Sequence, residues 1–396
     1  MLNNKLDNRR YEADINDIHL LIEITDYCNC KCIMCKHGNS NLIHGNIPKQ
    51  HMNAGLFMKI INDLKDGGMK VSSIDPLWCG ESMIHPDFKE MMRYLFAINK
   101  SHELFNGFIL NTNAITMDEE LSDIFLDYAQ FINRANNNSY YMTLYFSLDA
   151  IYPNTYQKIK GISGENLNRV INNIQCLVKK RKQYNTIFPN LVFAFIVMQE
   201  NKEDALEFGN FWKNFLESLD VPYVISPNWK LLRDRDTIYY KQLLLCKDSK
   251  ENEELHKNIC LQLGLVEDSK NIPIVETENI EPLRMPCGAL WRTPNIASNG
   301  DVVPCCRDVD LTMALGNVKE YPLRDIWAND RITELRTAHI KGEFSISPLC
   351  LSCSEPEGGI ISDDQIYKYL QSINRAELMG IYLNRKQKYC NQNLDR

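Results

Sequence analysis

The stretch C-N-C-K-C-I-M-C, from Cys28 to Cys35, decides how the rest of the chain is interpreted. It directly follows the largely apolar run 20–24, which predicts a buried strand. The thiolates of Cys28, Cys32 and Cys35, spaced C-x3-C-x2-C, can each hold one iron of a cubane cluster. The fourth iron then has no protein ligand, and an open iron at the end of a strand is a reaction site.

A zinc knuckle or a set of free thiols is the alternative for this loop. Zinc takes four ligands, often as two C-x2-C pairs, and Cys30 would supply a fourth thiol locally. A C-x-C pair fits the corner of a cubane poorly, so we expect Cys30 to be a spare thiol rather than a ligand.

Size and charge exclude several classes of protein. The chain of 396 residues is long enough for one large domain and a smaller one. Its net charge of −7 and pI near 5.7 argue against nucleic acid or an anionic membrane as the main partner. No apolar run approaches the roughly 20 residues that span a bilayer. Fourteen cysteines without an apolar signal segment at the polar N-terminus indicate metal ligands and free thiols in a reducing cytoplasm.

Strand-like and helix-like segments alternate between residues 19 and 227, which predicts a parallel sheet covered by helices. The predicted strands are His19–Thr25, Ser72–Trp78, Phe105–Thr112, Tyr141–Leu148, Asn190–Met198 and Val221–Ser226. The predicted helices include Leu56–Leu64, Leu121–Phe131, Leu167–Val178 and Leu206–Leu216. Six such units are fewer than the eight of a closed barrel.

A second cysteine module occupies the C-terminal part of the chain. The step from Gly300 to Cys305 predicts a tight hairpin that presents a thiolate. With Cys287 and the C-x2-C pair Cys350 and Cys353, four thiolates can close around one 4Fe–4S cluster. A structural zinc in the same four ligands is the alternative.

The residues around both modules resemble a known superfamily. I-E-I-T-D-Y-C-N-C-K-C-I-M-C is similar to the cluster loop of radical S-adenosylmethionine (SAM) enzymes, and 287–353 resembles their SPASM/twitch extension. The two resemblances cover most of residues 20–355. They imply an α/β fold, a partial (β/α)6 radical SAM barrel followed by a SPASM/twitch Fe–S domain. The implied organisation is an N-terminal extension (1–18), the barrel (19–230), a helical connector (231–285), the SPASM/twitch domain (286–355) and a helical tail (356–396).

The resemblance also implies the cofactors. SAM would chelate the open iron of a 4Fe–4S cluster, and an electron from a donor such as flavodoxin or ferredoxin would cleave it to a 5′-deoxyadenosyl radical. That radical abstracts a hydrogen atom from the substrate. The full SPASM pattern binds two auxiliary clusters, but Gly359 lies near the point where its next cysteine is expected. We therefore expect one auxiliary 4Fe–4S cluster, held by Cys287, Cys305, Cys350 and Cys353.

Several polar residues at strand ends resemble the SAM pocket of this superfamily. Leu77–Ser82 is similar to its G-E-P loop, in which Gly80 would let the backbone approach SAM and Glu81 would bind the SAM ammonium group. The other expected SAM contacts are Asn113, Ser147, Asp149 and Lys160. Each of these residues would otherwise be a strand-end polar group without a ligand.

The expected activity is hydrogen abstraction followed by oxidation or epimerisation. Cys306 and Cys79 are candidate hydrogen-atom donors for epimerisation, and Cys306 is also an alternative ligand to Cys305; either thiol would otherwise simply be buried. Only about 18 residues precede the first strand, too few for a leader-binding domain, so we expect a small polar substrate such as a sugar or aminocyclitol. The alternatives are modification of a ribosomally made peptide and a non-catalytic Fe–S or zinc protein.

Overall fold

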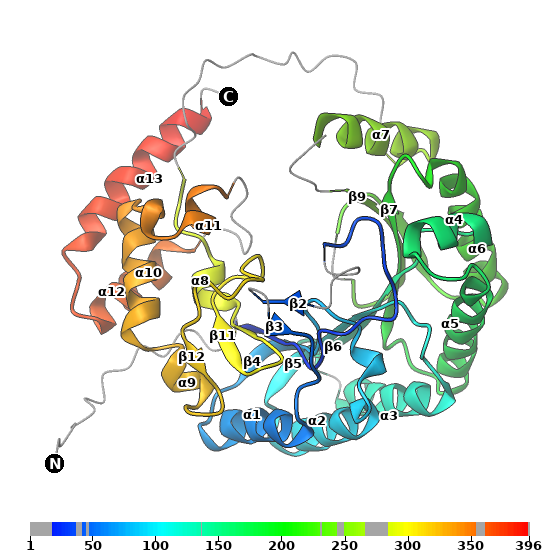
Figure 1. Cartoon of the computed structure of the whole chain (residues 1–396), viewed down its shortest axis with the longest axis horizontal. Helices are drawn as coiled ribbons and strands as arrows, with labels where there is room; N and C mark the ends of the chain where they lie inside the picture. The colour runs from blue at the N-terminus through cyan, green and yellow to red at the C-terminus, as the bar shows by residue number, and fades with distance from the viewer. Residues whose placement is uncertain are drawn as a thin grey trace.

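The structure, a computed structural model, describes residues 18–36, 42–44, 47–135, 137–229, 232–243, 249–265, 284–353 and 361–394. Its backbone is one ten-stranded sheet with the order β12-β11-β10-β1-β4-β5-β6-β7-β9-β8 (Figure 1). The strands of the N-terminal part are β1 (His19–Ile22), β4 (Val71–Asp75), β5 (Phe105–Thr112), β6 (Tyr141–Ser147), β7 (Asn190–Val197), β8 (Tyr223–Ser226) and β9 (Asp236–Gln242). These strands all run parallel, and the sheet curves without closing. The predicted α/β partial barrel is confirmed.

β9 is a strand that the sequence analysis did not predict. It pairs in parallel with both β7 and β8, inside a stretch that we expected to be a helical connector. Asp236 fixes its first residue, because its carboxylate forms an ion pair with Arg181 (2.6 Å) and accepts the N–H of Leu191 (2.9 Å). The predicted connector therefore contributes a strand to the barrel and only then a helix, α7 (Ser249–Gln262).

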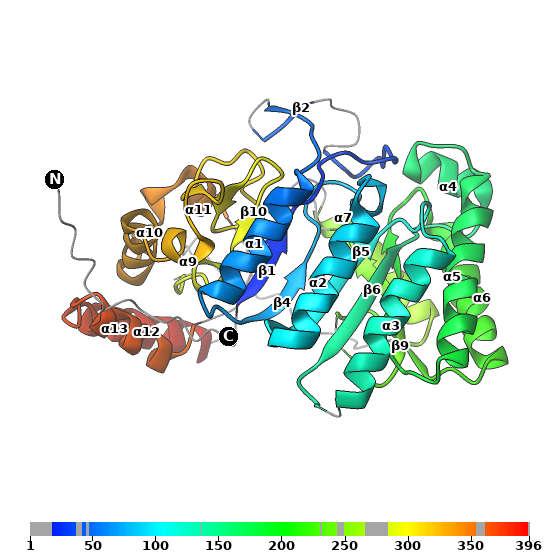
Figure 2. The same ribbon diagram turned by 90° about the horizontal axis from the view of Figure 1, so that it is seen from below.

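Helices cover the outer face of the parallel strands (Figure 2). They are α1 (Ala54–Asp66), α2 (Phe88–His102), α3 (Glu119–Ala135), α4 (Pro153–Lys160), α5 (Asn166–Gln183) and α6 (Ala205–Ser218). In α1, the Asn53 side chain caps the first turn, and Phe57, Ile60, Ile61 and Leu64 form the buried face. All four predicted helices are present, and α2 and α4 are additional.

The C-terminal module extends the same sheet at its other edge. β10 (Asn295–Ile296) pairs in parallel with β1, and β11 (Asp301–Val303) and β12 (Gly316–Asn317) follow as antiparallel strands. Gly300 turns the predicted hairpin with a φ of 93°, a conformation that L side chains rarely adopt. The helices of this module are α8 (Ala289–Arg292), α9 (Leu323–Ile326), α10 (Asp330–Lys341) and α11 (Pro348–Leu351).

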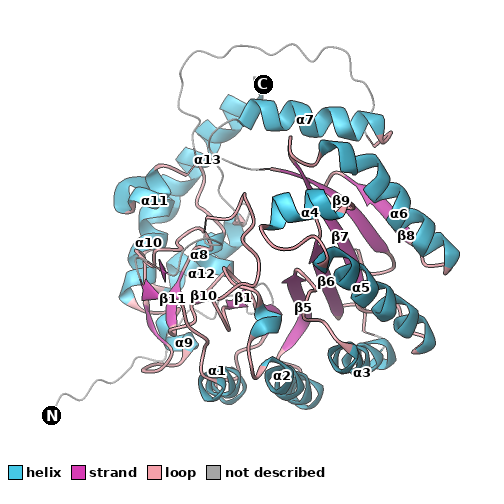
Figure 3. Ribbon diagram, turned by 45° about the vertical axis from the view of Figure 1, so that its right-hand side comes forward, coloured by secondary structure: helices cyan, strands magenta, loops and turns pink. Residues whose placement is uncertain are grey.

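The tail forms two helices, α12 (Asp363–Ser372) and α13 (Leu378–Leu394), which pack beside α10 (Figure 3). Asn374, with a φ of 55°, lies between them, so the single predicted helix is interrupted. Arg385 of α13 donates to the carbonyl oxygens of His339 (2.9 Å) and Ile340 (2.8 Å) at the end of α10. The remaining short elements are β2 (Leu42–Ile43), β3 (Ile47–Pro48) and the 3-10 turns Ser82–Ile84, Lys202–Asp204 and Phe344–Ile346.

Candidate active site

The cysteine loop lies at the carboxyl end of β1 and is held against the end of α4. The backbone N–H groups of Lys31 and Ile33 donate to the carbonyl oxygens of Lys160 (2.8 Å) and Ile159 (2.9 Å). These carbonyls belong to the last turn of α4 and would otherwise lack partners. The loop is therefore positioned by a helix end on the neighbouring part of the barrel, as well as by the strand that precedes it.

The four thiols of this loop differ in exposure. Cys35 is exposed, Cys28 and Cys32 are half-buried, and Cys30 is buried. A hydrogen bond from the Cys30 thiol lowers the pKa of Cys32 to about 7, against the effect of burial and with help from the nearby Lys160 charge. The amide of Asn113 also donates to Cys30 Sγ (3.4 Å). Cys30 thus supports the loop from beneath, an arrangement that agrees with its predicted place as a spare thiol.

The spacing of the thiols disfavours zinc. Tetrahedral zinc with Zn–S bonds of 2.3 Å places its sulfurs about 3.8 Å apart. Among the described residues, the only group of three or more His, Cys, Asp or Glu side chains with ligand atoms within 4.8 Å of one another is Glu23, Asp26 and His44. No three cysteine sulfurs in this part of the chain lie within that distance of one another, which disfavours a single zinc ion.

Gly80 and Glu81 pack directly against the start of the cysteine loop. A Cβ at Gly80 would lie 2.1 Å from the Thr25 carbonyl oxygen and 2.7 Å from that of Tyr27, which no other residue allows. We expected Gly80 to make room for SAM; the structure adds this close backbone contact as a second reason for glycine. Glu81 is buried, and its carboxylate accepts a hydrogen bond from Thr112 Oγ1 (2.8 Å). It also accepts from the backbone N–H groups of Asn113 (2.7 Å) and Met83 (3.3 Å).

Glu81 and Asn113 therefore form part of one internal network. Burial raises the pKa of Glu81, although the donors around it oppose this shift. Asn113 also donates to Asn29 Oδ1 (2.6 Å) in the cysteine loop. The network ties the ends of two strands to the cluster loop, and contact of either residue with SAM stays a prediction.

Lys160, Asp149 and Ser147 lie together at the carboxyl end of β6. Lys160 Nζ is 2.6 Å from Asp149 Oδ2 and donates to the Ser147 carbonyl oxygen (2.9 Å). Both charged side chains are 2% exposed. Burial alone would lower the pKa of Lys160, but the charges of Asp149 and Cys32 raise it. Lys160 is thus directed at Asp149 and Cys32, and its predicted role toward the SAM carboxylate stays a prediction.

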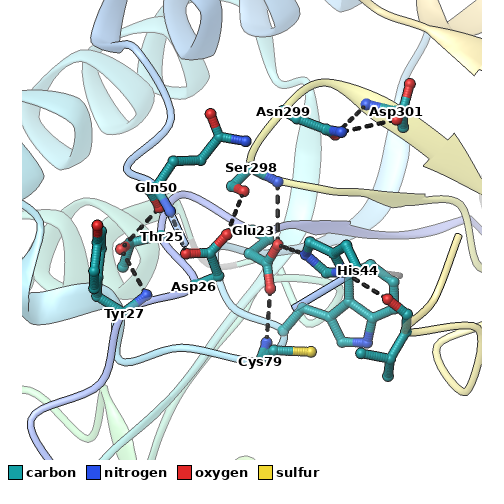
Figure 4. Close-up of polar contacts among 12 residues, drawn as sticks. Glu23, Thr25, Asp26, Tyr27, His44, Gln50, Cys79, Ser298, Asn299 and Asp301 are labelled. Carbon is teal, nitrogen blue, oxygen red and sulfur yellow. Dashed lines mark hydrogen bonds and ion pairs between the residues drawn. The ribbon is translucent and has the colours of Figure 1, made fainter. Parts of the chain in front are cut away.

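A buried ion pair lies beneath the loop that carries Cys79 (Figure 4). His44 Nε2 is 2.6 Å from Glu23 Oε2, and the same carboxylate accepts the backbone N–H of Cys79 (3.0 Å) and Ser298 (3.1 Å). His44 Nδ1 faces the carbonyl oxygen of Val309 at 2.6 Å. One carboxylate therefore connects β1, the loop after β4 and two segments of the C-terminal module.

Trp78 precedes Cys79 in the chain and contacts the backbone of Cys306. Burial, followed by the charge of Glu23, raises the pKa of Cys79, so its thiol keeps its proton. Trp78 Nε1 donates to the carbonyl oxygen of Cys306 (2.8 Å), and the Trp78 ring packs on His44 with centroids 5.3 Å apart. The main chain beside both candidate hydrogen donors thus forms part of the contact between the barrel and the C-terminal module.

The four predicted auxiliary ligands line a single cavity. Its walls include Cys287, Cys305, Cys350 and Cys353, whereas Cys306 is not among its lining residues. This arrangement favours Cys305 over Cys306 as the fourth ligand. Burial raises the pKa of Cys287 and Cys350 to about 11 each, and the neighbouring thiols add to the shift. A group that accepts electron density from these sulfurs would relieve this cost.

The inner face of the barrel carries polar and aromatic side chains that sequence analysis did not single out. Asn111 is exposed although β5 is an interior strand, since it points to the concave side of the sheet. On the same face, Asp75 ends β4, and burial raises its pKa to about 7 despite a hydrogen bond from Ser73. The alternation along each strand was the signal that would have identified these inward positions.

Comparisons with known proteins agree with this architecture. The SPASM iron–sulfur cluster-binding domain family matches residues 287–354. Over 361 residues the chain is 24% identical to the tungsten-containing aldehyde ferredoxin oxidoreductase cofactor-modifying protein of Pyrococcus furiosus, covering 85% of this chain and 87% of that protein. Over 71 residues it is 32% identical to the S-adenosyl-L-methionine-dependent 2-deoxy-scyllo-inosamine dehydrogenase of Niallia circulans, covering 18% of this chain and 27% of that protein.

Solved structures show the same fold. SuiB of Streptococcus suis, bound to SAM, aligns with a TM-score of 0.51 and 17% identity over 85% of this chain and 70% of its own. The anSMEcpe protein, also with bound SAM, aligns with a TM-score of 0.50 and 13% identity over 92% of this chain and 98% of its own. Residues 287–354 form a SPASM iron–sulfur cluster-binding domain, and the fold of the chain is that of these two SAM-bound proteins.

The SPASM match and the SAM-bound structures support 4Fe–4S clusters and SAM as the cofactors. The donor set of the auxiliary cavity fits an iron–sulfur cluster, because Arg284 Nε and His339 Nε2, which belong to residues that line it, are buried without hydrogen-bond partners in the described structure. Sulfides of a cluster are acceptors for such donors. In the part of the chain that the structure describes, no helix is long and apolar enough to cross a membrane.

Proposed function

We propose that the chain is a radical SAM enzyme that oxidises an alcohol carbon of a small polar substrate of the sugar or aminocyclitol type. The observation that carries the proposal is Asp75, a carboxyl on the inner face of the barrel with a pKa raised to about 7. A group that titrates near neutral pH is suited to accept a proton. Epimerisation returns a hydrogen atom and needs no such base, so Asp75 favours oxidation.

Conversion of a carbinol to a carbonyl removes a hydrogen atom from carbon, a proton from the hydroxyl and one further electron. When bound, SAM and the reaction cluster supply the radical that takes the hydrogen atom, and the auxiliary cluster supplies an acceptor for the electron. Cys28, Cys32 and Cys35 would hold the first cluster, and the four thiols of the SPASM cavity the second. Asp75 takes the hydroxyl proton at its carboxylate.

The surroundings of Asp75 support its role as a base. Ser73 Oγ lies 3.4 Å from Asp75 Oδ1 and 2.9 Å from His19 Nδ1, so the carboxyl lies next to a second polar group that can orient it. Burial raises the pKa of this carboxyl, which makes it a better proton acceptor than an ordinary aspartate.

Aromatic side chains form another part of the same inner face. Tyr145 and Tyr239 have ring centroids 6.3 Å apart, and Trp229 lies 5.6 Å and 5.8 Å from them. Trp229 is 45% exposed, so its ring is accessible to a ligand. Such rings pack against the apolar faces of sugar-like rings while their edges leave hydroxyl groups free to bond elsewhere. A peptide is the alternative substrate.

The test uses anaerobically reconstituted protein, reduced by dithionite or flavodoxin, with SAM and a panel of aminocyclitols that includes 2-deoxy-scyllo-inosamine. Two cubanes predict about eight irons per chain. We expect 5′-deoxyadenosine above the substrate-free rate and a product two mass units lighter. A product that keeps the substrate mass in ordinary water but gains one deuterium in heavy water would indicate epimerisation instead. Turnover only with peptides would show that the substrate class is wrong. No 5′-deoxyadenosine under any condition would leave a non-catalytic Fe–S protein.

A further inference from the structure

His339 of α10 reaches into the cavity that the four SPASM thiols line. The residue is 1% exposed. Its Nδ1 accepts the backbone N–H of Cys287 (3.4 Å), so the proton of the neutral ring is on Nε2. Nε2 is buried and has no hydrogen-bond partner in the structure. A buried N–H donor without an acceptor is costly, and this one belongs to a residue that lines the cavity of the four thiols.

The imidazole is not free to turn away from this cavity. The ring packs edge-on against Phe344, with centroids 4.8 Å apart. Its backbone carbonyl is held by Arg385 of α13 at 2.9 Å. The ring orientation is therefore set by Phe344 and by the Cys287 N–H, while Arg385 holds the backbone of the residue.

Other donors surround the same four thiols. Arg284 also lines the cavity, has a buried Nε without a partner, and is held by its Nη1, which donates to the Cys350 carbonyl oxygen (2.7 Å). Arg307 Nη1 lies 3.9 Å from Cys353 Sγ. The site thus combines two positive charges and one neutral N–H with four thiols, a strongly electropositive setting for an anionic cluster.

We propose that His339 donates its Nε2–H to a sulfur of the auxiliary cluster and raises the reduction potential of that cluster. Hydrogen bonds and positive charge near the sulfurs favour the reduced, more negative cluster, so they raise its potential. A raised potential makes the cluster an acceptor of the substrate electron. The inference rests on the auxiliary cluster of the proposed function, but it does not depend on which substrate is oxidised.

The test compares the potential of the auxiliary cluster in wild type, His339→Gln and His339→Leu by EPR-monitored redox titration of the reconstituted protein. Leucine removes the donor, so the auxiliary potential falls, while the reaction-cluster potential stays unchanged. Glutamine restores a donor near the Nε2 position and returns the potential toward that of wild type. His256→Leu is the matched control, because this histidine on α7 bonds the Tyr240 carbonyl oxygen and lies outside the cavity. It leaves both potentials unchanged.

A second measurement needs no variant. Pulsed EPR of the reduced auxiliary cluster is recorded on wild-type protein grown with 15N-histidine and on natural-abundance protein. We expect a 15N coupling in the first sample and a 14N coupling in the second. Absence of any histidine coupling, or equal auxiliary potentials in wild type and His339→Leu, overturns the proposal. Both readouts are made without substrate, so a failure here is distinct from a failure to oxidise aminocyclitols.

Discussion

Replacing Glu23 with glutamine should strongly destabilise the contact between the barrel and the SPASM domain. The Glu23 carboxylate faces three donors, from His44 at 2.6 Å and from the backbone of Cys79 and Ser298 at 3.0 and 3.1 Å. Both ring nitrogens of His44 face acceptors, because Nδ1 is 2.6 Å from the Val309 carbonyl oxygen, so the ring is a cation. Removing one partner of a buried pair costs about 3–5 kcal/mol.

We expect Glu23→Gln and His44→Gln each to lower the free energy of unfolding by about 3 kcal/mol or more, since Glu23 and His44 are 0% and 2% exposed. The double variant should lose less than the sum, because removing the second charge no longer leaves an unpaired one. Anaerobic urea unfolding measures this coupling. Asp236→Asn, which breaks the buried pair with Arg181 at the start of β9, is the control. It should lower the free energy of unfolding but leave the iron content of the cysteine loop unchanged.

The pH dependence follows from the same pair. Burial alone would lower the pKa of His44, but the hydrogen bond and charge of Glu23 raise it above its usual value. A raised folded-state pKa means that the stabilisation is fully present below about pH 6.5, the unfolded value, and is lost as the pH rises through the folded-state value. The stability difference between wild type and His44→Gln should therefore shrink with rising pH. Losses that are additive, or below about 1 kcal/mol, would refute the account of the pair.

Three further outcomes are expected. Cys305→Ser should lose about half of the iron, whereas Cys306→Ser should keep it, as iron and sulfide analysis will show; equal loss would contradict the ligand assignment. Gly80→Ala should lower the free energy of unfolding by about 1–3 kcal/mol and reduce SAM cleavage, because the new Cβ would lie 2.1 Å from a carbonyl oxygen. Gly380→Ala is the control and should be neutral in both assays, because its Cβ would meet nothing within 4 Å. Asp75→Asn should abolish the fall in turnover below about pH 7 together with most of the turnover. An unchanged pH profile in that variant would exclude Asp75 as the base.

The local parts of this structure were predictable from the sequence. The six predicted strands and four predicted helices follow from periodic burial, and the cysteine spacings carry the cluster sites in a few adjacent residues. β9 was missed because Asp236–Gln242 is short, lacks a clear alternation of polar and apolar residues and directly follows a charged stretch, 233–235. Periodicity weighs such a short segment poorly.

Long-range polar contacts were not predictable at all. Ser298 bonds Glu23 across 275 residues, and no local pattern distinguishes that glutamate from a polar residue within a strand. Lys160 shows the same limit, since its position suggested a ligand contact but its ion pair with Asp149 depends on how β6 and α4 meet. In both cases the physical cause is a partner brought in by the tertiary fold.

The parallel pairing of β10 with β1 has a consequence for the geometry between the two iron–sulfur sites. Leu21 lies opposite Asn295 and Ile22 opposite Ile296, so main-chain hydrogen bonds, rather than a linker, join the two modules. A shift of this pairing by two residues would displace one site relative to the other by about 6.6 Å, and tunnelling rates of electrons fall steeply over such lengths. The register of the two-residue strand β10 therefore determines the distance between the two iron–sulfur sites.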